Sequence, residues 1–147
     1  MAQDSRLVLT LRQLTERLRA EVYGGMANKG FPDVRPAHSA VLRNLPPEGA
    51  RIVELAEDAG MTKQSMAYLV SGLEAQGLVQ IAPDPSDGRA RIVTLTSRGE
   101  LAVRALIALS RDAERRLAEG MGEDRVRVLR MLSEQALQSM KDRDGYG

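Results

Sequence analysis

The chain has 147 residues, of which 43% are hydrophobic and 28% charged, and this length suits one domain with helical extensions. It contains no cysteine and one histidine, which excludes disulfides, thiol chemistry and cysteine–zinc sites, so neither a metal nor another cofactor is expected. No apolar run reaches membrane-spanning length and no signal peptide opens the chain, so a cytoplasmic protein without a membrane partner is expected.

A helix is predicted from the N-terminus to Gly24-Gly25, with Asp4 or Ser5 as its cap. Its apolar residues recur at helical spacing, and they are Leu7, Leu11, Leu14, Leu18 and Val22. The glycines and prolines of 26–36 predict a loop, and a short helix is expected over about 37–45. Pro46, Pro47 and Glu48 indicate a turn after it.

Residues 54–73 have the spacing of a helix-turn-helix. Ala56 is small where two helices must cross, and Gly60 can adopt the left-handed conformation that ends a helix. Met61 is expected to be buried in the turn, and Thr62 to cap the second helix. The apolar face of that helix comprises Met66, Leu69, Val70 and Leu73. Ordinary helical hairpins share this spacing, so a second signal is needed.

The second signal is a β-hairpin. Gly77 closes the helix, and two runs of apolar and β-branched residues, 78–81 and 91–95, predict short strands. Pro83, Pro85 and the Asp87-Gly88 pair predict the turn between them. Thr96 and Ser97 can cap the next helix, and Ser97 with Glu100 fits a capping box. A helix-turn-helix followed by a hairpin is a winged helix.

Three segments, 60–65, 73–79 and 84–96, resemble the MarR family of bacterial transcription regulators. Asp87 and Arg89, with Leu95-Thr96 after the second strand, are similar to that family's wing motif. The resemblance is close from about residue 35 to 99 and is architectural elsewhere. It implies a homodimer, an operator with inverted half-sites and, often, a small-molecule inducer.

The expected fold class is therefore mainly α with a small β-hairpin wing (α+β), a winged helix-turn-helix with flanking N- and C-terminal dimerisation helices. The DNA-binding domain is expected at 36–99, and the helical dimerisation region at 1–35 and 100–147. After the wing the sequence predicts an apolar helix, a break at 120–122, a last helix over 123–140 and a frayed tail over 141–147. The apolar residues of the two helices are Ala102, Leu106, Leu109, Ala113 and Leu117, then Val126, Leu129, Leu132 and Ala136.

Such apolar stripes also occur in monomeric bundles. Terminal helices that extend from a small winged helix, however, lack partners within one chain, which favours pairing with a second copy.

The expected function is sequence-specific binding of double-stranded DNA by a transcriptional regulator, with 62–76 as recognition helix in the major groove and 83–91 as wing in the minor groove. The candidate DNA-binding residues are Thr62, Lys63, Gln64, Ser65, Tyr68, Ser71, Asp87, Arg89 and Arg91. Gln64 can pair with adenine, and Arg89 can enter a narrow minor groove. Asp87 either orients Arg89 or shapes the turn. No nucleophile, base or phosphate loop indicates an enzyme.

The charge balance leaves one alternative open. The formal net charge is only +1, and residues 51–99 hold five basic and six acidic residues. A general electrostatic DNA binder is more basic than this. A winged helix that binds protein without specific DNA binding therefore remains the alternative.

A ligand-responsive repressor is the expected role within the resembled family, whose inducers sit between the dimer helices and the winged helix. Residues of this chain expected there are Tyr23, Phe31, His38 and Leu42. A tyrosine and a histidine beside apolar side chains suit a small aromatic or amphipathic ligand. The alternative for His38 is a helix cap or a surface group.

Overall fold

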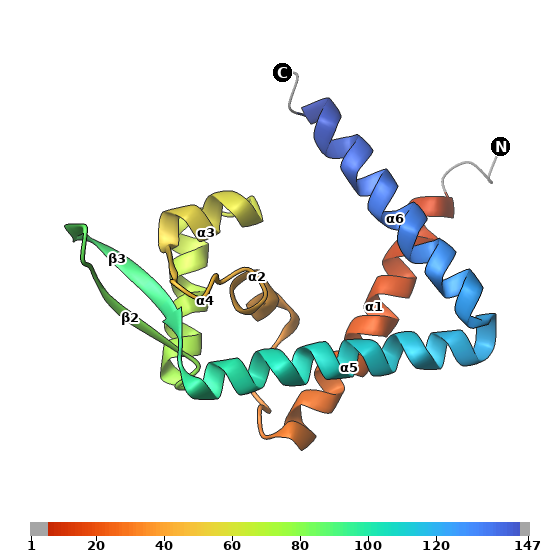
Figure 1. The fold of residues 1–147 in the computed structure, drawn as a ribbon, viewed down its shortest axis with the longest axis horizontal. Coiled ribbons are helices and arrows are strands. Elements are labelled where there is room, and N and C mark those ends of the chain that lie inside the picture. The colour runs from red at the N-terminus through yellow and green to blue at the C-terminus, as the bar shows by residue number, and fades with distance from the viewer. Residues whose placement is uncertain (1–5, 145–147) are drawn as a thin grey trace. The chain divides into compact units, whose positions relative to one another are not determined.

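The computed structural model describes residues 6–144, and its elements confirm the predicted class, mainly α with a β-hairpin (Figure 1). The chain divides into two compact units between Leu109 and Ser110. The elements are α1 (Arg6–Met26), η1 (Ala27–Lys29), η2 (Pro36–His38), α2 (Ser39–Leu42), β1 (Ala50–Arg51), α3 (Ile52–Ala59), α4 (Lys63–Ala75), β2 (Val79–Asp84), β3 (Asp87–Leu95), α5 (Ser97–Met121) and α6 (Glu123–Asp144).

Helix α1 continues through Gly24-Gly25 to Met26, so the predicted end at the glycines is wrong. A side chain at position 25 would overlap the side chain of Leu109, so glycine here serves the close approach of α5 rather than helix termination. Met26 is fully buried and anchors the end of α1 in the core of the first unit. The predicted caps Asp4 and Ser5 lie outside the described residues.

The short helix expected over 37–45 forms as η2 and α2. The predicted turn after it is present, because the backbone N–H of Gly49 donates to the carbonyl of Pro46 at 2.9 Å. Strand β1, which the sequence did not predict, pairs antiparallel with β3 through Ala50 and Arg51. A two-residue strand carries no periodicity, so only the pairing reveals it.

The helix-turn-helix is confirmed in α3 and α4. Gly60 has φ +63°, and the backbone N–H of Met61 donates to the carbonyl of Ala56 at 2.9 Å, which closes α3. Thr62 caps α4 by accepting from the backbone N–H of Ser65 at 3.1 Å. Met61 is only half-buried, so its predicted burial is wrong. On α4, Leu69 is half-buried, whereas three side chains are fully buried, and these are Met66, Val70 and Leu73.

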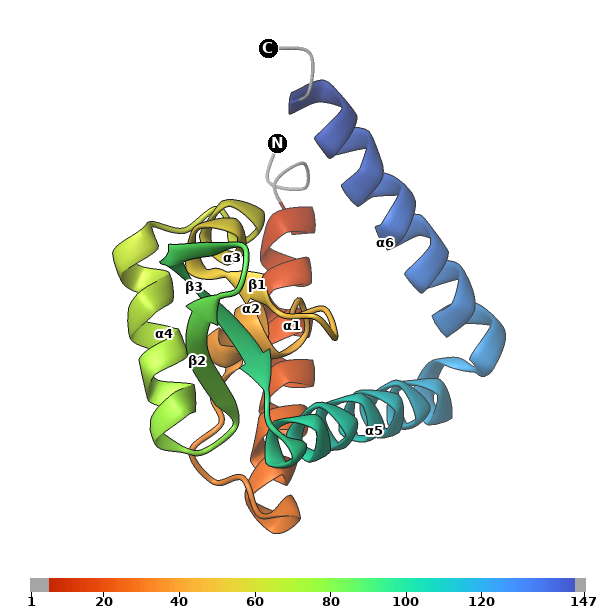
Figure 2. The same cartoon turned by 60° about the vertical axis from the view of Figure 1, so that its left-hand side comes forward.

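The wing is a three-stranded antiparallel sheet of order β1-β3-β2 (Figure 2). Strands β2 and β3 pair from Val79 with Leu95 to Asp84 with Asp87. The turn is therefore Pro85-Ser86, and the predicted Asp87-Gly88 turn is wrong because this pair already begins β3. The carboxylate of Asp84 accepts from both the backbone N–H and the hydroxyl of Ser86 at 2.8 Å, which shapes the turn at this earlier position.

Helix α5 begins at a joint between the sheet and α4. The hydroxyl of Thr96 donates to the carbonyl of Gly77 at 2.6 Å and accepts from the backbone N–H of Gly99 at 3.0 Å. Thr96 therefore caps α5, and the Ser97–Glu100 capping box is not the cap observed; the Glu100 carboxylate faces Arg104 at 3.9 Å.

The second unit consists of the C-terminal part of α5 and all of α6. Gly122, with φ +92°, separates the helices, Ala113 and Val126 are buried, and Arg130 pairs with Glu114. Residues 141–144 are helical, so the frayed tail predicted to begin at Lys141 is wrong there. Among the helices of residues 6–144, none combines the length and the apolar character required to cross a bilayer.

Gly99 provides a test of the joint. Gly99→Ala is expected to destabilise the protein by about 1–3 kcal/mol, because the added methyl overlaps the backbone carbonyl of Leu78, which cannot rotate away. Gly24→Ala is the matched control, since nothing lies within 4 Å of a methyl at this position of α1, and helix propensity predicts a gain of up to about 1 kcal/mol. Urea unfolding at one fixed protein concentration measures both, and equal midpoints would contradict the overlap.

Candidate nucleic-acid interface

The outer face of α4 is polar, and its side chains do not pack in the core. Opposite the buried residues of this helix lie Gln64, Ser65, Tyr68 and Ser71, all of which are exposed. Tyr68 is 80% exposed, which is unusual for an aromatic side chain and leaves its ring and hydroxyl available to a partner. The helix contains no arginine, so the commonest side-chain contact to guanine is missing from this face.

Two candidate residues at the start of α4 hydrogen-bond to each other. The hydroxyl of Thr62 donates to the hydroxyl oxygen of Ser65 at 2.9 Å, and also accepts from the backbone N–H of Ser65. Thr62 therefore serves mainly as the cap. The hydroxyl hydrogen of Ser65 remains available for an acceptor outside the protein.

Beside the start of α4, the wing and the start of α3 enclose an open hollow of about 570 Å³, the basic hollow. Four cationic and two acidic side chains line it, with three small or apolar residues: Arg51, Lys63, Arg89, Arg91, Glu54, Asp87, Ile52, Val53 and Ala90. The fold thus brings the predicted Lys63, Asp87, Arg89 and Arg91 together, although they lie on two elements. Gln64, Ser65, Tyr68 and Ser71 are not among its lining residues.

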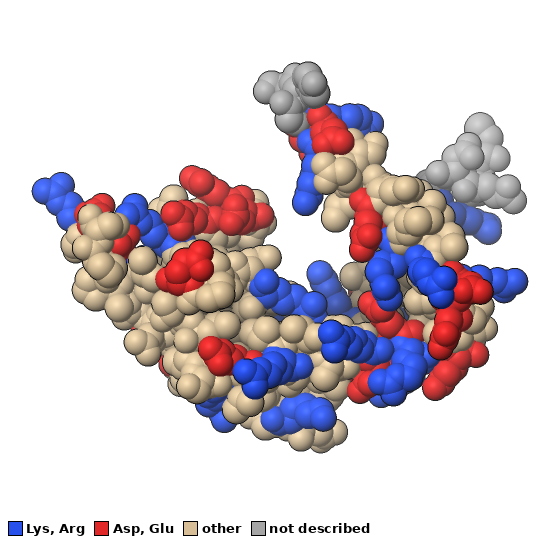
Figure 3. All heavy atoms as spheres, in the orientation of Figure 1, with Lys and Arg blue, Asp and Glu red and all other residues tan. Residues whose placement is uncertain are grey.

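Asp87 contacts the backbone of Arg89. Its Oδ1 accepts from the Arg89 N–H at 3.1 Å, which shapes the start of β3. Of the two roles considered for Asp87, this contact supports shaping the hairpin. Arg89 is exposed near the start of β3. Figure 3 shows basic side chains near the end of the wing.

Arg51 and Asp84 are functional candidates that the sequence analysis missed. Asp84 is only 6% exposed and accepts from Arg51 Nε at 2.8 Å and from Arg51 Nη2 at 2.6 Å. The Ser86 backbone N–H and hydroxyl, followed by the Arg51 guanidinium, lower the pKa of Asp84 to about 2. The partners are 33 residues apart, and only the Asp-Pro pair before the turn hinted at this role.

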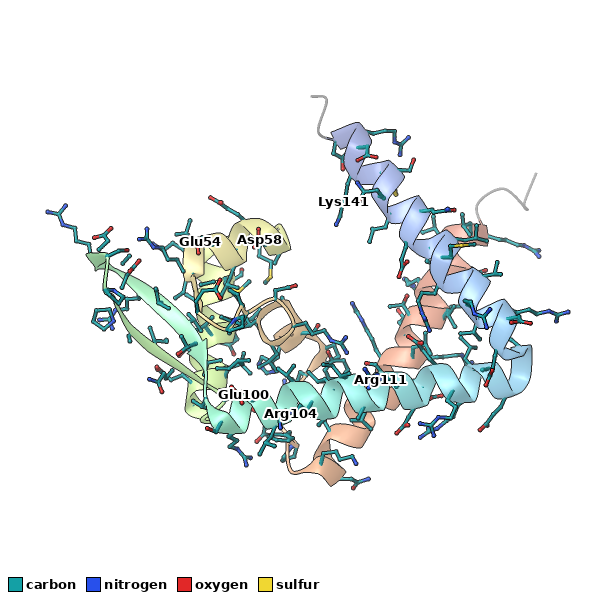
Figure 4. The ribbon with its side chains drawn as sticks, viewed as in Figure 1. Glu54, Asp58, Glu100, Arg104, Arg111 and Lys141 are labelled. Atoms are coloured by element: carbon teal, nitrogen blue, oxygen red, sulfur yellow. The ribbon has the colours of Figure 1, made fainter. Side chains whose placement is uncertain are left out.

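Acidic side chains gather on α3 (Figure 3), and one of them, Glu54, also lines the basic hollow. Glu54, Glu57 and Asp58 are exposed there, and Figure 4 labels Glu54 and Asp58 on this helix. Glu54 also caps α3, because its carboxylate accepts from the backbone N–H of Arg51 at 3.0 Å. These charges explain why residues 51–99 are not basic in total although the basic hollow is.

The candidate ligand residues are mostly packed within the first unit. Leu42 is 1% exposed, Phe31 is 7% exposed beneath the guanidinium of Arg98, and Tyr23 is half-buried. His38 is 9% exposed, and its Nδ1 accepts from the backbone N–H of Arg35 at 2.9 Å. This bond supports the interpretation of His38 as a cap.

His38 generates a pH prediction. Burial, and then the charge of Arg35, lower its pKa, so its contribution to stability is complete above about pH 6.5, the usual value in an unfolded chain, and is lost as the pH falls toward the lower folded value. His38→Asn keeps an acceptor for the Arg35 N–H but cannot titrate. Between pH 7.5 and 5, the urea midpoint of the wild type should fall more than that of the variant. Parallel declines would show that His38 does not titrate as inferred.

Comparison with known proteins shows which family the chain is similar to. A family model described as MarR family matches residues 33–90. The transcriptional regulator HosA of Escherichia coli O111:H- is 36% identical over 80 residues, which are 54% of this chain and 59% of HosA. The chain thus matches about three fifths of the length of this curated relative.

Solved structures extend the similarity in fold. A crystal structure of MarR is 21% identical, with a TM-score of 0.81 over 100% of this chain and 99% of the other. The transcriptional repressor CouR, bound to a 23-mer DNA duplex, is 28% identical, with a TM-score of 0.70 over 86% of this chain and 89% of CouR. CouR from Rhodococcus jostii RHA1 has also been solved with p-coumaroyl-CoA, at 25% identity and a TM-score of 0.71 over 95% of this chain and 92% of CouR. The family match over residues 33–90, the relatives and the shared fold make the chain similar to the MarR family of winged helix-turn-helix transcriptional regulators.

Proposed function

We propose that the protein is a ligand-responsive repressor that binds an inverted-repeat operator as a homodimer. The observation that carries the proposal is the arrangement on the first unit, where the exposed polar face of α4 begins beside the basic hollow, whose four cations come from β1, α4 and β3. A polar helix face suits the edges of bases in the major groove, and cations beside it suit the phosphates of the flanking backbone. CouR, a similar protein, is named a repressor and is bound to DNA.

The exposed side chains of α4 that we propose for the major groove favour contacts with adenine and thymine. Gln64 can donate to and accept from adenine, the methyl of Ala67 suits the thymine methyl, and Ser65 and Tyr68 each offer a hydroxyl. Lys63 borders the basic hollow, where it serves a phosphate or a guanine. Because α4 has no arginine, we expect the centre of each half-site to be specified mainly by A·T pairs.

The wing is proposed to reach the neighbouring minor groove. Arg89 and Arg91 are exposed on β3, and both line the basic hollow. A narrow A/T-rich minor groove has an enhanced negative potential that attracts an arginine. The residues proposed for the DNA site therefore remain the nine predicted ones, with Thr62 and Asp87 supporting the contacts of others.

The dimer is proposed from unpartnered apolar side chains on the terminal helices. The exposed residues on α1 are Leu7, Val8, Leu9 and Leu11, and those on α6 are Val128, Met131, Leu132, Leu137 and Met140. Apolar groups in such number along two helices indicate an interface, because leaving them in water is unfavourable. We assign 1–35 and 100–147 to dimerisation and 36–99 to DNA binding.

For the ligand, the proposal is a small aromatic or amphipathic molecule near Tyr23, Phe31, His38 and Leu42. CouR is a relative bound to p-coumaroyl-CoA, which has an aromatic acyl group. Since Phe31, His38 and Leu42 are buried, a ligand must enter beside them or displace part of their packing. A regulator of this kind acts where bacterial DNA is, in the cytoplasm.

A first prediction concerns the dimer. Light scattering should give twice the chain mass of 16.1 kDa. Leu132→Glu should shift the protein toward monomer, because it puts a charge into the proposed interface, while Glu134→Gln on the same helix should not. Helical content measured by circular dichroism should be similar in both variants. A folded wild-type monomer at micromolar concentration would rule out the dimer.

A second prediction tests DNA binding itself. Fluorescence anisotropy with duplexes tiled across the DNA upstream of the chain's own gene should reveal binding that weakens with salt. Arg89→Ala should weaken it and flatten the slope of log affinity against log salt by about one unit per half-site. Arg104→Ala removes the same charge from an exposed position of α5 and should bind normally. Absence of salt-dependent binding by the wild type would favour the protein-interaction alternative, and normal binding by Arg89→Ala would remove the wing from the DNA site.

A further inference from the structure

One buried carboxylate gathers four hydrogen bonds at the outer end of the wing. Asp84 Oδ1 accepts from the backbone N–H and the hydroxyl of Ser86, and Oδ2 accepts from Arg51 Nε and Nη2. One oxygen thus holds the hairpin turn, and the other holds a residue at the beginning of α3. Asp84 is 6% exposed, whereas the partners in three ion pairs on helix surfaces, Arg12–Glu16, Arg104–Glu100 and Arg127–Asp124, are all more than half exposed.

Arg51 is tied to the helix-turn-helix at the other end of this contact. Its backbone belongs to β1, pairs with Ile92 of β3 and is capped by Glu54 in the first turn of α3. Its guanidinium, with the side chain 38% exposed, crosses to Asp84. The contact therefore joins the start of α3 directly to the outer end of the hairpin.

Apart from the Arg51–Asp84 contact, few interactions fix the direction of the outer part of the hairpin. Near its base, Val79 and Val93 are buried in the core. Toward its end, residues 85–89 are all exposed, and the β2–β3 register shifts between Pro83 and Asp84. A hairpin that is anchored by apolar packing at its base alone bends easily at such an irregularity.

We propose that Arg51 and Asp84 are positioning residues for the wing: their ion pair sets the distance between the hairpin end and α3–α4, and so aims Arg89 at the minor groove. The effect of this ion pair on DNA binding rests on the proposed function. Its anchoring of the hairpin end rests on the structure alone. Neither side chain is required to touch DNA. Arg91, which lies in the same hollow as Arg51 and Arg89, is aimed by the same contact.

The first arm of the test needs no DNA. Amide hydrogen exchange should be faster for residues 84–90 in Arg51→Met and Asp84→Asn than in the wild type, and unchanged for α4. Arg104→Met and Asp58→Asn are matched controls, because both residues are exposed on other elements of the same unit. Arg51→Lys should restore part of the protection, since lysine keeps the charge but loses the two-pronged geometry. Wild-type exchange rates in Arg51→Met and Asp84→Asn would overturn the inference whatever the protein binds.

The second arm is a double-mutant cycle measured by anisotropy on the upstream duplex that the wild type binds best. Arg51→Met should weaken binding by about tenfold, close to the effect of Arg89→Ala, and the double variant should be little worse than either, because a misdirected Arg89 has no contact left to lose. If the two losses multiply and Arg51→Met also flattens the salt slope by about one unit per half-site, Arg51 is itself a phosphate ligand and the positioning role is wrong. If the wild type binds no duplex while the exchange arm succeeds, the proposed function fails and the anchoring stands.

Discussion

Met66, Val70 and Leu73 are fully buried on one side of α4, and this burial determines which residues of the helix reach solvent. At 3.6 residues per turn, fixing these three leaves Gln64, Tyr68 and Ser71 on the opposite face. The cap at Thr62 and the left-handed Gly60 hold the beginning of the helix at a set angle to α3. The polar face therefore follows from the core, and a change that rotates α4 in its packing would move at once every side chain that we propose for the major groove.

The wing depends on a different kind of interaction. Its base shares the core with α4, but its outer end is held by hydrogen bonds and charge around Asp84. Hydrophobic burial is non-directional, whereas a two-pronged contact between a guanidinium and a carboxylate fixes both distance and angle. The protein uses the first where a core must be filled and the second where an exposed hairpin must be aimed.

Much of this arrangement could be predicted from the sequence, because its signals are local. The roles of Gly60, Thr62 and the apolar residues of α4 can be inferred from neighbours within one or two helical turns. The α+β class followed from these roles. Contacts between distant segments could not be predicted. Gly25 resembles a helix end until Leu109 is seen beside it, and Arg51 resembles any surface arginine until the fold brings Asp84 within reach. The misplaced hairpin turn has the same origin: Asp87-Gly88 has good turn propensity, but the contacts of Asp84 with Ser86 and Arg51 favour a turn at Pro85-Ser86.

The two-residue turn also limits how this hairpin can change in length. Alternate residues of β3 face opposite sides of the sheet where the ladder is regular, so Arg91 shares the side on which Val93 is buried, and Arg89 lines the same hollow as Arg91. Inserting one residue between Arg91 and Val93 would move both arginines to the opposite side while the base of the sheet stayed paired. Insertions in pairs, matched on β2, would lengthen the wing and keep its chemistry. Between its base and Arg91, the hairpin can therefore grow or shrink only in steps of two residues per strand, whereas its outer end, where the register shifts, is not bound to this step.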